Sequence, residues 1–276
     1  MLPAGRSSYP FPDPRGGGRR LTIHTYRPAD FNADRPILMV VHGRARNGTD
    51  YRDYFVPDAE RRGFLVVAPE FDEAQYPNPY AYNYGNMCDA SGRILPRDQW
   101  LFPVLEAAFR DVRSRAGSRP ERFFVFGHSA GSQLVHRMAT FGWLDTVERA
   151  VAANAGSYTL PVHGEAFPFG LDGTPATDDD LRRLFSRPII VQLGDSDVDP
   201  NDTHLPREPG AMRQGPHRYA RGRNYFDTAR REAERLGVPL AWRLAIVPGV
   251  AHSGQNMAPH AARELFGEVL AGAETR

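Results

Sequence analysis

The sequence predicts an α/β fold with a mostly parallel central sheet and helices on both faces. Short runs of β-branched and aromatic residues alternate with helical stretches along the chain, which is typical of this class. Most of the runs are continuously apolar, as expected for strands that are covered on both faces. The strands are expected at Leu21–Tyr26, Ile37–Val41, Phe64–Ala68, Phe123–Phe126, Ala150–Ala153, Ile189–Leu193 and Trp242–Val247.

Four helices are expected between and after these strands. Gln99–Ala116 is the clearest, because Leu101, Leu105 and Phe109 recur at helical spacing on one face. The others are Ser132–Thr140, Tyr219–Leu236 and Pro259–Leu270. Two long irregular segments, 70–98 and 195–218, follow predicted strands and should lie at the carboxyl edge of the sheet, where open α/β folds bind ligands.

The chain is expected to divide into a short arm and one domain. Residues 1–18 are rich in Pro, Gly and Arg and hold too few apolar groups to pack, so we expect a flexible N-terminal arm. Residues 19–276 show no internal repeat and no linker and are expected to form a single domain. The first thirty residues lack the apolar stretch of a signal peptide. We therefore expect the chain as written in the cytoplasm, or in the periplasm or outside the cell if a leader was removed.

Composition excludes several classes of protein. All 34 residues counted as Lys+Arg are arginine, so Schiff-base and P-loop lysine chemistry is excluded. Cys88 is the single cysteine, which excludes an intramolecular disulfide, a zinc finger and a CxxC redox centre. The longest apolar runs have five residues, whereas a membrane-spanning helix needs about 18, so no membrane insertion is expected. A formal charge of +1 gives no reason to expect a nucleic-acid partner, and no oligomeric state is predicted.

One pentapeptide carries the strongest signal for chemistry. Gly127-His128-Ser129-Ala130-Gly131 follows an apolar strand and opens a helix, the strand–turn–helix context that a G-x-S-x-G nucleophile requires. The glycines have a steric reason, because a sharp turn holding a strained serine leaves no room for neighbouring Cβ atoms. The bare pattern is weak, and the alternative is a serine that only caps the helix. We predict that Ser129 is a nucleophile.

A serine nucleophile needs a base and an orienting acid. His252 follows the last predicted strand and is the expected base, with His42 and His128 as the alternatives tied to the same edge. Asp197, three residues after Gly194, is the expected acid and completes the chain order Ser, acid, His. Asp195 and Asp199 stay open as replacements for Asp197.

The oxyanion of an acyl-transfer intermediate needs backbone donors. The amide after the nucleophile, that of Ala130, is expected as one donor. The amide of Arg44, in the loop that begins His42-Gly43, is expected as the other. The acidic run from Asp195 does not fit a calcium loop, since prolines occupy the positions of the required Gly and Glu. No metal and no cofactor are predicted.

With these residues in place, the chain over roughly residues 20–270 resembles an α/β-hydrolase. The blocks VVHGRARNGTDYRDYFVPDAERRGFLVVAPEF, FGHSAGSQLVHRM and QGPHRYARGRNYF resemble the poly(3-hydroxybutyrate) depolymerase-like bacterial serine esterases, which are related to feruloyl and acetylxylan esterases. The resemblance implies a cofactor-free hydrolase acting on a small-molecule or oligomeric ester. Secreted depolymerases typically carry disulfides, a linker and a polymer-binding domain, which this sequence lacks, so short-chain, aryl or hydroxyalkanoate oligomer esters are the easier substrates.

Several side chains on the long loops are candidates for the substrate pocket, because aromatic walls with a few polar groups suit acyl and aryl esters. They are Asn83, Tyr84, Trp100, Ser157, Tyr158, His217 and Tyr219. Trp100 and Tyr158 fit a packed core equally well. A polyester depolymerase, an acyltransferase or peptidase using the same triad, and a non-catalytic ligand-binding homologue remain the alternative functions.

Overall fold

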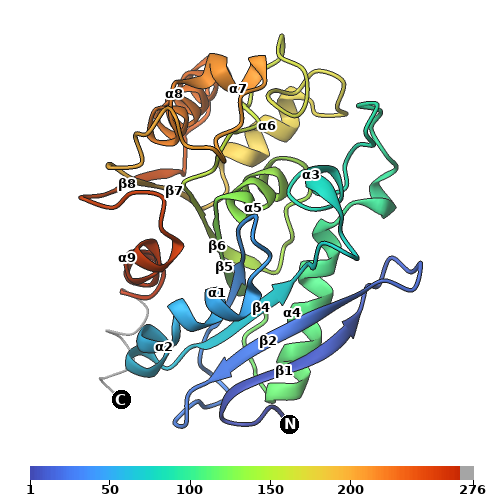
Figure 1. Ribbon diagram of the computed structural model, residues 1–276, viewed down its shortest axis with the longest axis vertical. Coiled ribbons are helices and arrows are strands. Elements are labelled where there is room, and N and C mark those ends of the chain that lie inside the picture. Colours follow the sequence, from blue (N-terminus) through green and yellow to red (C-terminus); the bar gives the residue numbers. More distant parts are fainter. Residues whose placement is uncertain (268–276) are drawn as a thin grey trace.

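A computed structural model describes residues 1–267, in which eight strands form one twisted sheet with the order β1-β2-β4-β3-β5-β6-β7-β8 (Figure 1). β1 and β2 are antiparallel to their neighbours, and the strands from β4 to β8 pair in parallel. The strands are β1 Gly5–Pro12, β2 Arg20–Arg27, β3 Ile37–Val41, β4 Leu65–Glu70, β5 Phe123–His128, β6 Val147–Ala153, β7 Ile189–Gly194 and β8 Arg243–Val247. The predicted α/β class with a mostly parallel sheet is confirmed.

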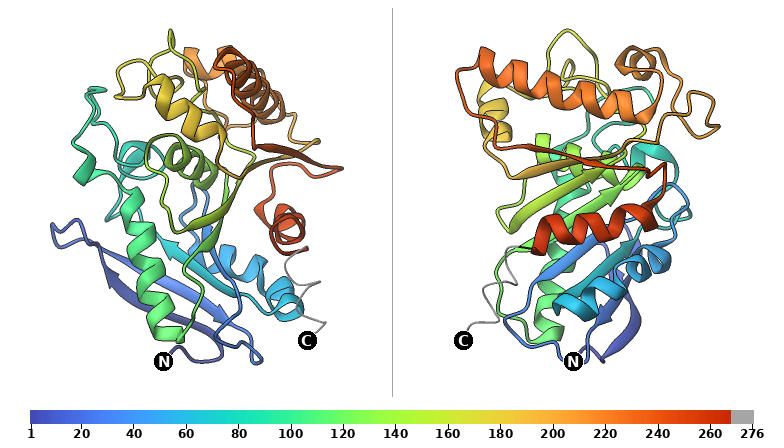
Figure 2. Two further views of the ribbon diagram at one scale, coloured as in Figure 1. Left: turned by 180° about the vertical axis from the view of Figure 1, so that it is seen from behind. Right: turned by 90° about the vertical axis from the view of Figure 1, so that its left-hand side faces the viewer.

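Helices cover both faces of the sheet (Figure 2). The apolar sides of α4, α5, α6 and α8 pack on one face, and those of α1, α2 and α9 pack on the other. The helices are α1 Gly48–Tyr54, α2 Val56–Arg62, α3 Asn78–Ala81, α4 Phe102–Ala116, α5 Ala130–Phe141, α6 Asp178–Phe185, α7 Pro209–Gln214, α8 Arg218–Arg235 and α9 Gly254–Phe266, with a 3₁₀ turn at Arg97–Gln99. Strands β3 to β7 therefore lie between two apolar layers, which explains their continuous apolar runs.

The N-terminal segment differs from the expectation. Instead of a flexible arm over residues 1–18, Gly5–Pro12 forms the edge strand β1 and pairs with β2 along its whole length. The side chains of Leu2 and Phe11 are buried in the core, and the Tyr9 hydroxyl donates to Asp111 at 2.8 Å. Prolines are tolerated on an edge strand, so the two prolines within β1, Pro10 and Pro12, do not prevent its pairing with β2.

Helix boundaries show a second difference. α9 begins at Gly254 rather than Pro259, because the Ser253 side chain caps it by accepting the Asn256 amide at 3.2 Å. Pro259 lies inside the helix, and residues 268–270 of the predicted helix fall outside the described residues. The predicted helix Gln99–Ala116 is divided into the 3₁₀ turn and α4. The short helices α1, α2, α3, α6 and α7 were not predicted from the sequence. For α6 a signal was present, because Thr177 and Asp180 form a capping box at its start.

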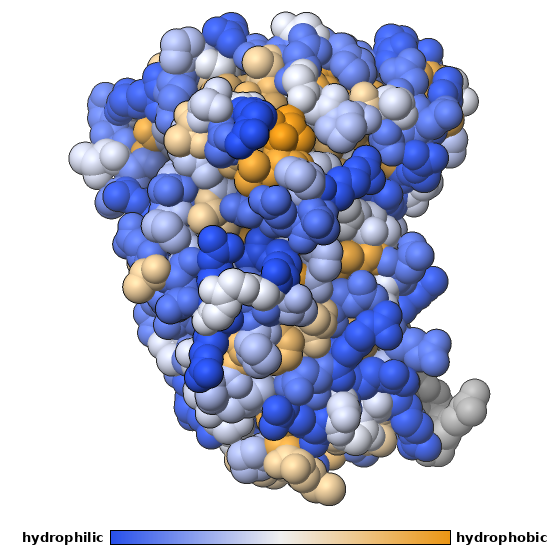
Figure 3. Space-filling model, turned by 90° about the vertical axis from the view of Figure 1, so that its right-hand side faces the viewer, coloured by the Kyte–Doolittle hydropathy of each residue, from blue (hydrophilic) through white to orange (hydrophobic). Residues whose placement is uncertain are grey.

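Large apolar side chains are rarely exposed within residues 1–267. Those exposed are Met1, Val198, Met212 and Ile246. The face drawn in Figure 3 is mainly hydrophilic, with its apolar side chains in small separate patches. No helix in the described part of the chain combines the length and the apolar character needed to cross a bilayer.

The packing of β1 predicts a measurable contribution to stability. Phe11→Ala removes a buried ring and should lower the free energy of unfolding by about 2–4 kcal/mol, measured by urea denaturation. Arg19→Ala, at an exposed position of the turn between β1 and β2, should change it by less than about 0.5 kcal/mol. Equal stability of the two variants would mean that residues 1–18 do not pack as described.

Candidate functional site

Ser129 lies at the turn between β5 and α5, in the middle of the sheet. Its backbone has φ 57° and ψ −117°, a conformation that L-residues rarely adopt and that turns the side chain out at the carboxyl edge. The Ser129 amide donates to the carbonyl of Ala153 at 3.0 Å, and the Gln133 amide donates to the Ser129 carbonyl at 3.1 Å. The strained residue is thus fixed by a neighbouring strand and by its own helix.

The glycines on either side of Ser129 are sterically required. A Cβ on Gly127 would lie 2.3 Å from the carbonyl oxygen of Gly131, and one on Gly131 would lie 2.1 Å from the carbonyl oxygen of Val41. Both distances are far below any real contact, and the atoms met are backbone atoms that cannot rotate away. The turn brings α5 directly against the end of β3.

The structure brings Ser129, His252 and Asp197 together from three separate loops. Nε2 of His252 lies 3.0 Å from Ser129 Oγ, and Nδ1 of the same ring lies 2.7 Å from Asp197 Oδ2. Asp197 is 4% exposed, so water does not weaken its interaction with the ring. These are the distances and the order that a serine nucleophile, a general base and an orienting carboxylate require.

The other two aspartates of the acidic run have different roles. Asp195 Oδ1 accepts the Gly249 amide at 2.7 Å and so ties the loop after β7 to the loop after β8. Asp199 is exposed and accepts the Asn201 amide at 2.8 Å. Of the three carboxylates considered, Asp197 is the one in contact with His252.

The predicted oxyanion donors come from two different segments, Ala130 from the start of α5 and Arg44 from the loop after β3. Ala130 and Arg44 both line the cavity at Ser129, and a Cβ on Gly43 would stand 3.6 Å from Ser129 Cβ. Within residues 1–267 neither the Ala130 amide nor the Arg44 amide donates to a protein acceptor. Two amides without protein partners beside a nucleophile can stabilise a developing oxyanion.

His42, which the sequence offered as an alternative base, is buried and neutral and supports the neighbouring loop. The Phe71 amide donates to its Nε2 at 3.0 Å, so Nδ1 holds the proton and donates to the Gly43 carbonyl at 2.9 Å. Burial lowers the pKa of His42 to about 3. The ring therefore holds the loop of Gly43 and Arg44 in place and takes no part in proton transfer.

His128, the other alternative, lies behind His252. Their ring centroids are 4.7 Å apart, and His128 Nδ1 lies 2.8 Å from the hydroxyl of Tyr51. Burial above all, and then the nearby His252 and Arg218, keep the pKa of His128 well below its ordinary value, so the ring is neutral. The Tyr51 hydroxyl would also lie 2.8 Å from a Cβ on Gly43 and 3.1 Å from one on Gly254, so it packs against the loop after β3 and the start of α9 as well as His128. No sequence signal pointed to Tyr51, which lies in the unpredicted helix α1.

A cavity of about 730 Å³ opens at Ser129 and is lined by two of the predicted substrate residues, Asn83 and Tyr84. Besides Ser129 and His252, its other charged and polar lining groups are Arg44, Arg46, Glu73, Asn78, Tyr82, Gln133, Thr203, His204, Glu208 and Arg218. Its apolar ones include Ala45, Pro79, Leu205 and Pro206.

Five predicted substrate residues do not line this cavity. Trp100 is buried against Phe102 and Phe141, and Tyr158 is buried and stacks on Tyr225. Both predictions were wrong because packing buries these rings in the core. Ser157, His217 and Tyr219 also lie outside the lining.

Each of these three residues has a supporting contact. Ser157 accepts from Gln133 Nε2 at 3.1 Å, His217 caps α8, and the Tyr219 amide donates to the Asp197 carbonyl at 3.1 Å. Gln133 itself lines the cavity and was missed. Its position four residues after Ser129, on the same face of α5, was the signal for it.

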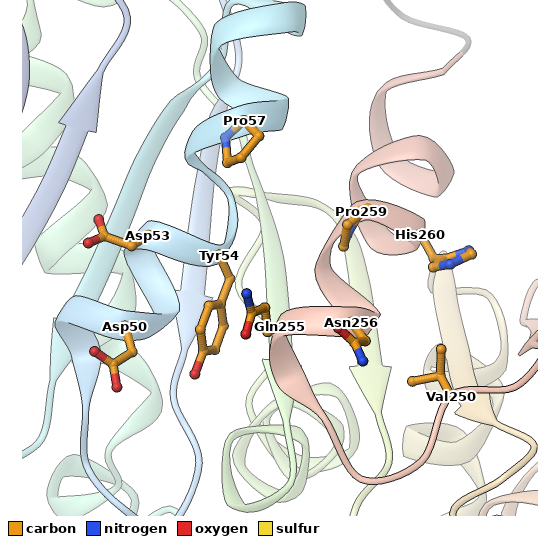
Figure 4. A pocket seen from close by; sticks show the side chains of 9 residues that line it. All are labelled: Asp50, Asp53, Tyr54, Pro57, Val250, Gln255, Asn256, Pro259 and His260. Atoms are coloured by element: carbon orange, nitrogen blue, oxygen red, sulfur yellow. The ribbon is translucent and has the colours of Figure 1, made fainter.

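A second hollow lies between α1–α2 and α9 (Figure 4). Asp50, Asp53 and Tyr54 line it from α1, and Gln255 and His260 line it from α9. None of the predicted site residues borders it. No group of three or more His, Cys, Asp or Glu side chains in residues 1–267 is placed to hold a metal ion.

No family model and no curated protein matches the chain. Among solved structures, LpqC, a poly(3-hydroxybutyrate) depolymerase from Bordetella parapertussis, is 40% identical at a TM-score of 0.91, over 96% of this chain and 90% of that chain. Poly(aspartic acid) hydrolase-1 from Sphingomonas sp. KT-1 is 37% identical at a TM-score of 0.91, over 96% of this chain and all of the other. An S-formylglutathione hydrolase from Staphylococcus aureus shares the fold at 15% identity and a TM-score of 0.62, over 96% of this chain and 98% of that chain.

The contact between Gly131 and β3 predicts a large effect of one methyl group. Gly131→Ala should lower the free energy of unfolding by about 3 kcal/mol or more, the upper end of overpacking costs, measured by urea denaturation. Ser132→Ala is the matched control, because Ser132 is buried in the same turn and its hydroxyl has no partner in residues 1–267. It should leave stability unchanged or slightly higher, and a tolerated Gly131→Ala would contradict the packing described.

Proposed function

This chain belongs to the poly(3-hydroxybutyrate) depolymerase-like esterases of the α/β-hydrolase fold and is a carboxylic ester hydrolase, and we propose that it cleaves short or oligomeric esters through an acyl-enzyme on Ser129. The observation that carries this proposal is the pair of contacts of His252, 3.0 Å to Ser129 Oγ and 2.7 Å to Asp197. They provide a base for the hydroxyl and a fixed tautomer for the base.

In the first half-reaction, Ser129 Oγ attacks the ester carbonyl carbon while His252 Nε2 takes the hydroxyl proton. The carbonyl oxygen becomes an oxyanion that accepts from the amides of Ala130 and Arg44. The intermediate collapses when the bond to the leaving alcohol breaks and His252 returns the proton to the alcohol oxygen. Asp197 stabilises the imidazolium that exists between the two transfers.

In the second half-reaction, water takes the place of the alcohol. His252 accepts a proton from the water as its oxygen attacks the acyl carbon, and the same amides donate hydrogen bonds to the new oxyanion. Collapse releases the carboxylic acid, and the proton returns from His252 to Ser129 Oγ. Water is the only co-reactant consumed.

The cavity supports a short or polar acyl group. Arg44, Glu73 and Glu208 place charges on a lining that also offers the amides of Asn83 and Gln133. A long alkyl chain would have to lie beside these charged and amide groups, whereas a hydroxy ester would find hydrogen-bond partners among them.

A second candidate is hydrolysis of a polymer or its oligomers, since the two similar structures above are named for a polyester depolymerase and a poly(aspartic acid) hydrolase. Incubation with 3-hydroxybutyrate trimer, with a polymer film and with poly(aspartic acid), followed by chromatography of the products, separates these cases. Release of monomers from the trimer but not from the film would favour the oligomer esterase.

The serine mechanism is tested with p-nitrophenyl butyrate. Ser129→Ala should lower kcat/KM by at least about a thousandfold, as expected when a triad nucleophile is lost. Ser132→Ala, three residues further along α5, should keep wild-type activity. A fluorophosphonate probe should label the wild type and Ser132→Ala but not Ser129→Ala. Unchanged hydrolysis by Ser129→Ala, with its circular dichroism intact, would refute the assignment.

The acyl preference is tested with p-nitrophenyl acetate, butyrate and octanoate. Because charged and amide side chains interrupt the apolar lining of the cavity, kcat/KM should be lower for octanoate than for the two short esters by roughly tenfold, or ~1.4 kcal/mol. A steady rise with chain length would instead indicate a lipid-type pocket.

A further inference from the structure

Asp197 has a second partner besides His252. Its Oδ1 lies 3.4 Å from Nη1 of Arg218, and the same Nη1 lies 2.7 Å from Oδ2 of Asp202. The four groups form a continuous chain of alternating charge, from the His252 ring through Asp197 and Arg218 to Asp202. The serine mechanism described above uses only the first two of them.

Burial makes this chain of charges electrostatically strong. The Arg218 side chain is 2% exposed and that of Asp197 is 4% exposed, while Asp202 at 23% is the member nearest to solvent. Charges removed from water interact over longer distances and are screened less by salt. Arg218 Nε is buried and has no hydrogen-bond partner in residues 1–267, so the contacts that hold the guanidinium are those of Nη1 with the two carboxylates.

The backbone fixes Arg218 at this place. It is the first residue of α8, whose N-terminus is capped by the His217 side chain. The next amide, that of Tyr219, donates to the Asp197 carbonyl at 3.1 Å. The start of α8 therefore positions both the backbone of Asp197 and the Arg218 guanidinium that faces the Asp197 carboxylate.

We infer that Arg218 is a positioning residue that, with Asp202 as its counter-charge, sets the proton affinity of His252 through Asp197. The inference rests on the proposed role of His252 as the base. A cation behind Asp197 draws the carboxylate away from the imidazolium and disfavours the protonated ring, and the Asp202 anion offsets part of that effect.

The other groups near His252 do not provide this control. Ser129 and His128 approach the ring from the end of β5, and Tyr51 contacts His128. Asp197 and Asp202 belong to the loop after β7, as does His204, whose Nδ1 lies 3.8 Å from Asp202 Oδ1 at an exposed position. Arg218 belongs to α8, and Arg44 lines the same cavity as His252. Burial keeps His128 neutral. The hydrogen bond from Arg218 lowers the pKa of Asp202 to about 2, so Asp202 is an anion throughout the working range.

The inference predicts shifts of opposite sign in two variants. Arg218→Gln removes the cation, which should favour imidazolium and move the acid limb of the kcat/KM profile to higher pH. Asp202→Asn removes the anion and should move the same limb to lower pH. Each shift should be on the order of one pH unit, as for a unit charge within a buried cluster. Arg218→Lys keeps the charge and should stay closer to wild type than Arg218→Gln.

A matched control uses the same loop. Asp199 is exposed and bonds only to a local amide, so Asp199→Asn should leave the profile within about 0.2 pH units of wild type, since solvent screens an exposed charge. Asp202→Asn changes the member of the cluster nearest to solvent and keeps the test valid if Arg218→Gln does not fold.

A measurement without turnover separates this inference from the proposed function. In the Ser129→Ala background, the midpoint of the His252 ring titration is followed by NMR in each variant. Midpoints that move up in Arg218→Gln and down in Asp202→Asn support the inference, whatever ester the wild type hydrolyses. Midpoints that stay within 0.2 pH units, or that move in the same direction, overturn it. Failure of the proposed function would show differently, as wild-type protein without esterase activity.

Discussion

The site depends on a single steric constraint, the contact of Gly131 with the end of β3. No side chain fits there, since a Cβ would meet the carbonyl oxygen of Val41 at 2.1 Å. The contact places the first turn of α5 beside the loop that follows β3, where a Cβ on Gly43 would stand 3.6 Å from Ser129 Cβ. It also forces Ser129 into its strained backbone conformation. The nucleophile and both amide donors are thus positioned by one close approach of backbone to backbone.

Buried cations and neutral imidazoles support the walls of the cavity. Arg137 is fully buried and has no carboxylate partner among residues 1–267; it donates to the carbonyl of Asn83 at 2.9 Å and to Thr159 Oγ1 at 3.0 Å. Its guanidinium also lies over the ring of Tyr84, 4.6 Å from the centroid. Burial lowers the pKa of Arg137 only to about 10, so it keeps its charge. His136 resembles His42, since the Thr159 amide donates to its Nε2 at 3.0 Å and fixes the neutral tautomer.

Local sequence predicted the parts of the site that local geometry determines. The turn at Ser129 needs two glycines within five residues, and the position of Asp197 after Gly194 needs only the end of β7, so both could be predicted from short segments. The cavity walls could not, because whether Trp100 or Tyr158 faces ligand or core depends on partners such as Phe141 and Tyr225, which are far away in the sequence. The edge strand β1 was missed for a similar reason, since its stability comes from β2 and from the burial of Phe11.

The base is supported by the least protected strand of the site. Ser129 follows β5 at the centre of the sheet, whereas His252 follows β8, which pairs with β7, forms the edge of the sheet within residues 1–267 and exposes Ile246. The free energy needed to unfold such an edge segment locally is lower than that needed to unfold the central strands beside it. Heating would therefore detach the imidazole from the serine while the core is still folded. The upper working temperature of the enzyme would be set by the fraying of five residues, and inactivation would be reversible up to the point where the rest of the sheet melts.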